Sequence, residues 1–299
     1  MKTNIFLRIV YTSSIFAFSL IKPTELCPQD ILEIMKKEHN AQDADQTIKN
    51  MVSNALTQCN MPEDFSVLTS STTSDRTSAR IRSLERNAPM DKFLILNTTN
   101  RTLNDIDYAI HHELGHIQHN HNAKKIYYKG QKYIEGIAAT LSSLALTVYG
   151  GARYELPITY NALLSLAAMG LTGTGSYYYG KSACLKKSRE FEKEADIFAY
   201  QHLIRQEKIT VVLEAIADRL GTHYGQVNNI IRPPAKKTHP EALERARYGL
   251  QELKNHGYSI PDLINNLPPD IDAGIAEHLP DAAKKYCPEF FSDKKALDK

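Results

Sequence analysis

Cysteine is scarce in this chain, and its four copies stand far apart. Cys27, Cys59, Cys184 and Cys287 form no CxxC pair, which excludes a zinc ribbon and a thioredoxin-type redox motif. In an exported protein an even number of cysteines permits disulfides, and Cys27–Cys59 is the pairing that we expect first. In a reducing compartment the same side chains would be small buried hydrophobic groups.

A large excess of charge of one sign is also missing. The formal net charge is +2 over 299 residues, whereas a nucleic-acid-binding surface needs concentrated positive charge. The composition therefore gives no reason to expect a nucleic-acid partner. With 42% hydrophobic and 23% charged residues, the chain has the composition of a globular protein, and its length suits one moderately large domain with short extensions.

Apolar runs as long as the roughly 20 residues of a membrane-spanning helix are missing too. At the N-terminus, Lys2 and Arg8 precede a shorter apolar stretch, Ile9–Ile21, in the pattern of an export signal. We therefore expect residues 1–26 to be a signal peptide or an N-terminal membrane anchor, with a buried first helix as the alternative. The protein would then be exported or membrane-associated, in the cell envelope or periplasm.

Two further apolar segments, Ile134–Val148 and Ile158–Leu171, lie on either side of a short linker. Both are rich in Ala, Ser, Gly and Thr, which favours close helix packing, so we predict a helical hairpin within residues 134–179. Its outer flanks are basic, as in a hairpin that spans a membrane. Each segment is shorter than a spanning helix, so a buried hairpin, or one on a membrane surface, is an equal alternative.

The remaining hydrophobic patterns predict mostly helices. We expect helices over residues 28–60, from Asn104 or Asp105 through Ile117, over 188–206, Val211–Leu220 and Glu241–Leu253, a strand over Phe93–Leu96, and a loop over 66–90. The fold class is therefore α+β and mainly α-helical, with a small sheet.

The segment His112-Glu113-Leu114-Gly115-His116 carries the most specific chemical pattern in the chain. In a helix, two histidines four residues apart project from one face and can bind one metal ion. Glu113 lies beside them, where it could take a proton from a water whose pKa zinc lowers to about 7. We therefore predict one zinc ion per chain, bound by His112 and His116, with Glu113 as the catalytic base. A helical pair of surface histidines is the simpler alternative.

A catalytic zinc also needs a third protein ligand. The metzincin pattern would place Gly at 119 and His at 122, but the chain has His119 and Asn122. A carboxylate from another helix is expected instead, and two pairs have the i, i+4 spacing in which one carboxylate binds zinc and the other orients a ligating His. These pairs are Glu192 with Asp196 and Glu190 with Glu194. The spacing alone does not choose between them.

Three segments, in this order, resemble one group of zinc endopeptidases. HHELGHIQHNH (residues 111–121), SREFEKEAD (188–196) and THPEALER (238–245) are similar to the HtpX, type I CAAX prenyl endopeptidase and OMA/BepA-like families. The resemblance covers residues 93–247. It implies a zincin-like metallopeptidase fold with an apolar helical hairpin inserted between the first two segments.

The resemblance also implies roles for single residues. The first Glu of the family's E-x-x-x-D element, here Glu192, would be the third zinc ligand, and Asp196 would support the zinc ligands from behind without binding the metal itself. His239 would stabilise the oxyanion of the tetrahedral intermediate, and Arg245 would help to hold that site. The Phe93–Leu96 strand would hold extended substrate by main-chain pairing.

Extra histidines surround the motif. By resemblance, His121 matches a common family position, for which a structural role is expected. His111 and His119 add imidazoles that a metal assignment has to consider, and we expect them to lie at the surface.

These observations predict a zinc-dependent endopeptidase that hydrolyses envelope or membrane-associated proteins, in quality control or processing. Its partners would be protein or peptide substrates and a membrane, while its oligomeric state stays open. The alternative is a non-catalytic zinc-binding or chaperone-like protein, which would have no physical reason to retain Glu113. The expected parts are the export segment or anchor (1–26), an N-terminal helical segment with a connecting loop (27–92), the metallopeptidase domain (93–256) and a polar C-terminal tail (257–299).

Overall fold

The computed structural model of the chain describes residues 40–62, 65–70, 92–99, 101–228 and 240–292, together with positions 33, 36 and 37. The export segment or anchor, the Cys27 partner of the expected disulfide, and His239 therefore lie outside the described residues. So do most of residues 28–39 of the predicted first helix, and residues 71–90 of the predicted loop.

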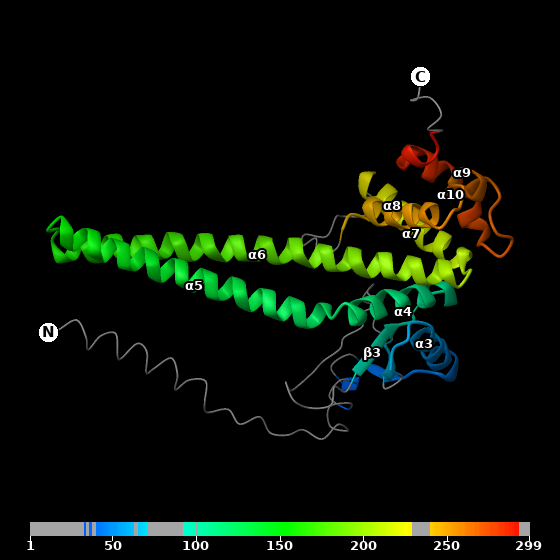
Figure 1. The fold of residues 1–299 in the computed structure, drawn as a ribbon, viewed down its shortest axis with the longest axis horizontal. Coiled ribbons are helices and arrows are strands. Elements are labelled where there is room, and N and C mark those ends of the chain that lie inside the picture. The colour runs from blue at the N-terminus through cyan, green and yellow to red at the C-terminus, as the bar shows by residue number, and fades with distance from the viewer. Residues whose placement is uncertain are drawn as a thin grey trace.

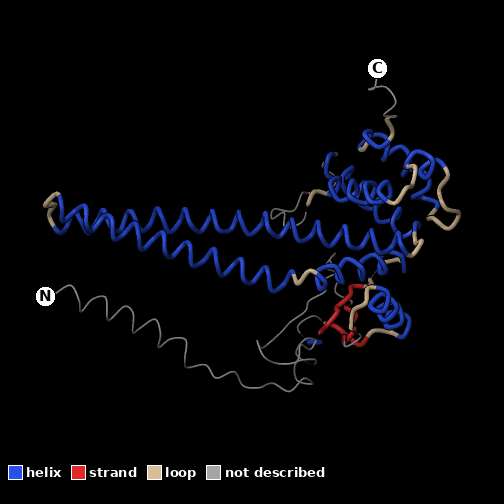
Figure 2. The backbone as a smooth tube through the Cα atoms, viewed as in Figure 1, coloured by secondary structure: helices blue, strands red, loops and turns tan. Residues whose placement is uncertain are grey.

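The described residues are mostly helical, and their strands form one three-stranded sheet (Figure 1). The predicted α+β, mainly helical fold class with a small sheet is therefore confirmed. Figure 2 shows the strands gathered at one end of the molecule, beside the helix that carries the HExxH motif.

The sheet has the order β1-β2-β3 and consists of β1 (Ala41–Asp43), β2 (Phe65–Ser70) and β3 (Lys92–Asn97). β1 pairs with β2 antiparallel and β2 pairs with β3 parallel. The strand predicted over Phe93–Leu96 is therefore present, and within the described residues it is an edge strand.

In the N-terminal region one prediction is wrong and another is confirmed only in part. Residues 66–70, predicted as a loop because of their Ser and Thr content, form most of β2, where Thr69 and Ser70 are buried between two paired neighbours. Of the helix predicted over residues 28–60, the structure has α3 (Gln46–Gln58), preceded by the strand β1. Asp45 caps α3, because its side chain accepts a hydrogen bond from the backbone N–H of Ile48.

Helix α4 (Leu103–Gln118) carries the HExxH segment and lies across the sheet (Figure 1). Its N-cap is Thr102 rather than the predicted Asn104 or Asp105. Thr102 accepts from the backbone N–H of Asp105, whose carboxylate accepts from the backbone N–H of Thr102 in return, a reciprocal capping box. The buried apolar side chains of α4 that pack with α3 and β3 are Ile106, Ile110 and Leu114. This packing fixes the rotation of α4 about its own axis.

The predicted hairpin is present, but its helices are much longer than the two apolar segments. Helices α5 (His121–Arg153) and α6 (Ile158–Arg205) run side by side and project from the rest of the molecule (Figures 1 and 2). The helix predicted over 188–206 is confirmed as the last part of α6. Many large apolar side chains of the hairpin are exposed, so a buried hairpin is excluded for the described residues.

The exposed apolar side chains raise the question of whether a helix crosses a membrane. Among the helices that the structure describes, none combines the length and the apolar content that crossing a membrane requires.

The C-terminal helices form a second core with the end of α6. They are α7 (Ile209–Val227), α8 (Ala242–Asn255), α9 (Ile260–Asn265) and α10 (Ala273–Tyr286), followed by a short 3-10 turn (Pro288–Phe290). The helices predicted over Val211–Leu220 and Glu241–Leu253 are thus confirmed. Residues 257–299, expected to be a polar tail, contribute Ile260, Ile264 and Leu279 to this core.

Candidate metal centre

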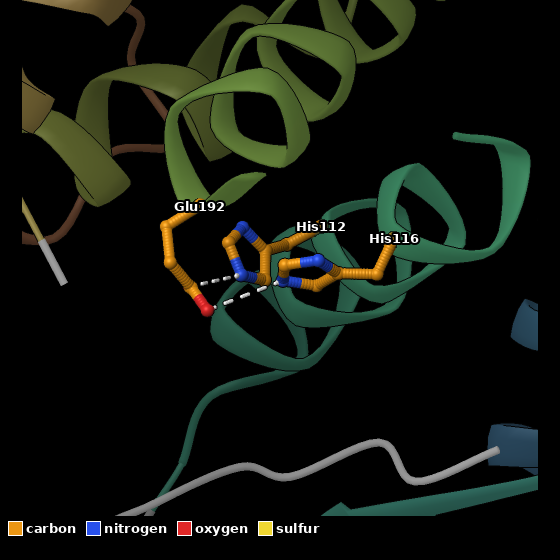
Figure 3. Close-up of side chains that lie close together, drawn as sticks. All are labelled: His112, His116 and Glu192. Atoms are coloured by element: carbon orange, nitrogen blue, oxygen red, sulfur yellow. Dashed lines mark ion pairs between the residues drawn. The ribbon is translucent and has the colours of Figure 1, made fainter. Parts of the chain in front are cut away.

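Three of the predicted metal ligands converge where α4 crosses α6 (Figure 3). Nε2 of His112 lies 3.4 Å from Oε2 of Glu192, and Nε2 of His116 lies 3.6 Å from Oε1 of the same carboxylate. Ligands on one tetrahedral zinc, with bonds of about 2.0–2.1 Å, lie about 3.4 Å apart. The donor set and its spacing therefore fit one zinc ion, and of the two carboxylate pairs left open by the sequence, Glu192 with Asp196 is the one beside both histidines.

A glycine allows the two helices to approach this closely. A Cβ atom on Gly115 would lie 2.9 Å from Cα and 3.1 Å from the carbonyl oxygen of Ala195, distances that a side chain does not tolerate against backbone. Ala195 is itself fully buried. Glu192 stands about one turn before Ala195 on α6, so the close contact brings its carboxylate within reach of the imidazoles.

Asp196 lies directly behind the metal ligands and is fully buried. Arg245 of α8 donates two hydrogen bonds of 2.6 Å to its carboxylate, and the Tyr108 hydroxyl donates a third of 2.9 Å. Burial by itself would raise the pKa of Asp196, but Arg245 and His112 together hold it well below its usual range. Asp196 is therefore an ionised carboxylate.

The same carboxylate orients His112. Nδ1 of His112 lies 2.8 Å from Oδ1 of Asp196, which leaves Nε2 facing Glu192. Burial would lower the pKa of His112, but the surrounding carboxylates, with Asp196 foremost and Glu113 among them, raise it to about 9. The negative charge of these carboxylates also favours a divalent cation beside Nε2 of His112 by Coulomb attraction. Glu113 itself is buried, with a relative exposure of 9%.

His111 faces away from the candidate site. It was expected at the surface, but its side chain is fully buried. Its Nδ1 lies 2.9 Å from the backbone oxygen of Asp107 and its Nε2 lies 3.0 Å from the side-chain nitrogen of Gln206. Because its ring nitrogens contact Asp107 and Gln206, and it does not belong to the group of His112, His116 and Glu192, it takes no part in the metal centre.

His121 lies on the outer side of the metal centre and is almost completely buried. Its Nδ1 is 2.8 Å from Nδ1 of His116, and its Nε2 is 2.8 Å from a carboxylate oxygen of Glu194. Its ring stacks on Phe191, with 4.6 Å between ring centres. Burial is the main cause that lowers the pKa of His121 to about 4. His119, His121 and Glu194 also form a second group whose potential ligand atoms lie within 4.8 Å of one another.

Two residues at the site were not predicted for it. Tyr108 stands one turn before His112 on the same face of α4, so the i, i+4 spacing contained a signal for it. Glu194 was part of the second carboxylate pair, but no pattern in the sequence indicates that a buried histidine links it to His116. Its expected pair partner, Glu190, instead accepts a hydrogen bond from Lys187.

Arg245 stands where the resemblance suggested a supporting residue, and its guanidinium is bound to Asp196. The oxyanion-binding role expected for His239 stays a prediction.

The comparison with protein families gives one match. Residues 40–253 match the model of the family described as Peptidase family M48, which is more than half of the chain. The matched range begins before β1 and ends within α8, so it includes the sheet, the hairpin and all the residues of the candidate metal centre. Neither the comparison with curated proteins nor the comparison with solved structures gave a match.

Proposed function

Because the chain belongs to peptidase family M48, we propose that it is a zinc-dependent endopeptidase that hydrolyses envelope or membrane-associated proteins. The observation that carries the proposal is the convergence of His112, His116 and Glu192 at ligand-to-ligand distances suited to one zinc ion. His112 and His116 would each give Nε2 to the metal, and Glu192 would give a carboxylate oxygen.

In the proposed reaction, the residues of the chain hold the reacting groups and move protons. Zinc, when bound, would lower the pKa of the attacking water and polarise the scissile carbonyl. Glu113, next to the ligands but not one of them, would take the proton from that water and later give it to the leaving amine. His239 would donate a hydrogen bond to the oxyanion, while Arg245 and Asp196 keep His112 in its binding orientation.

The proposed substrate is an extended polypeptide. β3 is an edge strand among the described residues and leads, through a short connection, into α4. A free strand edge can pair with an extended chain through main-chain hydrogen bonds, which fits a protease that recognises unfolded segments more than side-chain sequence.

Removing the third ligand tests the proposal directly. Purified wild type should contain one zinc per chain and cleave casein, whereas Glu192→Ala should lose both, because two imidazoles alone bind zinc weakly. Zinc is measured by mass spectrometry after dialysis, and cleavage by release of labelled peptides. Glu190→Ala is the matched control: this carboxylate of the same helix pairs with Lys187 and should be dispensable for both.

Two other results for the wild-type protein would count against a zinc endopeptidase. Wild type that takes up no zinc under metal-replete conditions would contradict the proposal. Wild type that binds zinc but cleaves no unfolded protein would favour the non-catalytic, chaperone-like alternative.

We further propose that the distal half of the α5–α6 hairpin binds a lipid bilayer. Residues 136–152 and 156–180 contain no charged side chain, yet this region exposes many large apolar groups, and such surfaces usually mark interaction sites. Next to this region, on the side toward the metal centre, lies a band of tyrosines. Lysines lie at the same level as these tyrosines or nearer to the metal centre. Interfacial aromatic residues and headgroup-binding residues follow one another in this order at a membrane surface. These residues are Tyr127, Tyr128, Tyr133 and Tyr177–Tyr179, with Lys124, Lys125, Lys129, Lys132, Lys181, Lys186 and Lys187.

Vesicle binding tests this second proposal. Wild type should sediment with vesicles of phosphatidylcholine and phosphatidylglycerol, and less with phosphatidylcholine alone. Combining Leu146→Glu with Leu163→Glu, at positions 71% and 65% exposed, should abolish sedimentation. Val227→Glu, at a 57% exposed position of α7 outside the hairpin, should leave it unchanged. Equal sedimentation of the double variant and wild type would refute a role of the hairpin.

A further inference from the structure

The two ligating histidines differ in what supports them from behind. A histidine that binds a metal through one ring nitrogen is normally fixed by a hydrogen bond at the other. For His112 the group at that position is the carboxylate of Asp196. For His116 it is another imidazole, because Nδ1 of His121 lies 2.8 Å from its Nδ1.

The protons on this pair of imidazoles can be assigned by elimination. If Nε2 of His116 binds the metal, a neutral His116 carries its proton on Nδ1. It then donates to Nδ1 of His121, which must present its lone pair and carries its own proton on Nε2. That proton points at Glu194, whose carboxylate oxygen lies 2.8 Å away. One assignment satisfies both hydrogen bonds.

We propose that His121 and Glu194 are positioning residues for zinc: a hydrogen-bond chain from His116 through His121 to Glu194 fixes the ring and the tautomer of the second ligating histidine. This inference rests on the proposed function, because it takes His116 as a zinc ligand. It gives each histidine ligand its own carboxylate, Asp196 by direct contact and Glu194 through one intervening ring.

The chain is held in place by its surroundings. The His121 side chain is only 3% exposed and stacks between Phe191 on one side and His119 on the other. Asn120 precedes it in a left-handed conformation, with φ of 52°, which Asn adopts more readily than most residues. This turn breaks the path between α4 and α5 and brings His121 back beside His116.

His121 and Glu194 fit a hydrogen bond better than they fit a second metal ion. Nε2 of His121 and the Glu194 oxygen are 2.8 Å apart, a hydrogen-bond distance, whereas two ligands on one tetrahedral zinc lie about 3.4 Å apart. A metal on Nε2 of His121 would also move its proton to Nδ1, opposite the Nδ1 proton of His116. With zinc on His116, two donors would then face each other.

Zinc affinity of folded variants tests the chain. His121→Phe keeps an aromatic ring against Phe191 but removes the acceptor, and it should raise the zinc Kd about 10- to 100-fold, measured by competition with a chromophoric chelator. Glu194→Gln should raise it less, because an amide oxygen can still accept from His121. The double variant should bind zinc no more weakly than His121→Phe alone, since both changes interrupt one chain.

The matched control is Glu190→Gln, which changes a carboxylate one turn before Glu194 on α6 that pairs with Lys187 instead of His121; its zinc Kd should stay within about twofold of wild type, because an exposed ion pair contributes little. Thermal unfolding of the zinc-free proteins separates lost folding from lost zinc affinity. An unchanged zinc Kd in both His121→Phe and Glu194→Gln would overturn the inference while leaving the proposed function intact. Failure of wild type to bind zinc would instead overturn the proposed function.

A spectroscopic measurement addresses the protons themselves. Long-range ¹H–¹⁵N spectra of the zinc-loaded protein should show His116 with its proton on Nδ1 and His121 with its proton on Nε2, assigned with single histidine variants. In Glu194→Ala the His121 signals should shift or show both tautomers. A His121 proton on Nδ1 in the wild type would refute the chain.

Discussion

Replacing Glu113 with Gln is expected to lower kcat for peptide hydrolysis by about 10²- to 10⁴-fold, the usual contribution of a general base. Glutamine has the same size and can still form hydrogen bonds, but it does not accept a proton from water. Zinc content should stay at one per chain, because Glu113 lies outside the set of His112, His116 and Glu192 that forms the candidate metal centre. Initial rates on a fluorogenic peptide, with zinc measured on the same samples, check both parts.

The matched control for this change is Glu190→Gln, which removes one carboxylate from α6 outside the metal centre and should leave kcat and zinc content near their wild-type values. Glu113→Gln with normal kcat would exclude Glu113 as the base. Loss of zinc from Glu113→Gln would mean that Glu113 helps to bind the metal.

Replacing Arg245 with Met is expected to destabilise the zinc-free protein by about 3–5 kcal/mol, because removing one partner of a buried ion pair leaves a buried charge without compensation. Asp196 is completely buried and receives two of its hydrogen bonds from this guanidinium. Urea unfolding at neutral pH with a chelator present measures the free energy of unfolding.

Arg247→Met provides the comparison, because Arg247 lies two residues further along α8 and forms an ion pair of 2.8 Å with Glu289, in which both side chains are more than 40% exposed. An exposed pair contributes about 1 kcal/mol or less. The prediction would be wrong if the two substitutions lowered the free energy of unfolding by similar amounts.

The metal-binding histidines were easier to predict than the residues that hold them in position. The spacing of His112 and His116 places both on one helix face whatever surrounds that helix. The choice of Glu192 needed a family resemblance, because the spacing of Glu190 and Glu194 is identical and only the crossing of α4 and α6 separates the two pairs. The role of His121 depends on how α5 turns back at Asn120, which the sequence does not specify by any periodic pattern.

The errors in the fold have similar physical causes. Ser and Thr in residues 66–70 favour turns, but pairing with a strand on each side outweighs that local preference. Thr102 was missed as a helix cap because Asn104 and Asp105 are equally good capping residues. Asp105 does take part in the cap, since its carboxylate accepts a hydrogen bond from the backbone N–H of Thr102. His111 was expected at the surface because histidine is polar, yet Asp107 and Gln206 satisfy both of its ring nitrogens in the interior.

Helix α6 runs without a break from the tip of the hairpin to beyond Glu192. At 1.5 Å per residue, the metal ligand therefore stands about 20 Å along the helix from Tyr179. If the tyrosine band rests at the lipid surface, this length of helix sets the height above the bilayer at which a polypeptide meets the catalytic groups. A membrane-anchored substrate would then be cut at a fixed distance from its anchor, whatever its sequence there, and peptide bonds closer to the lipid would be out of reach.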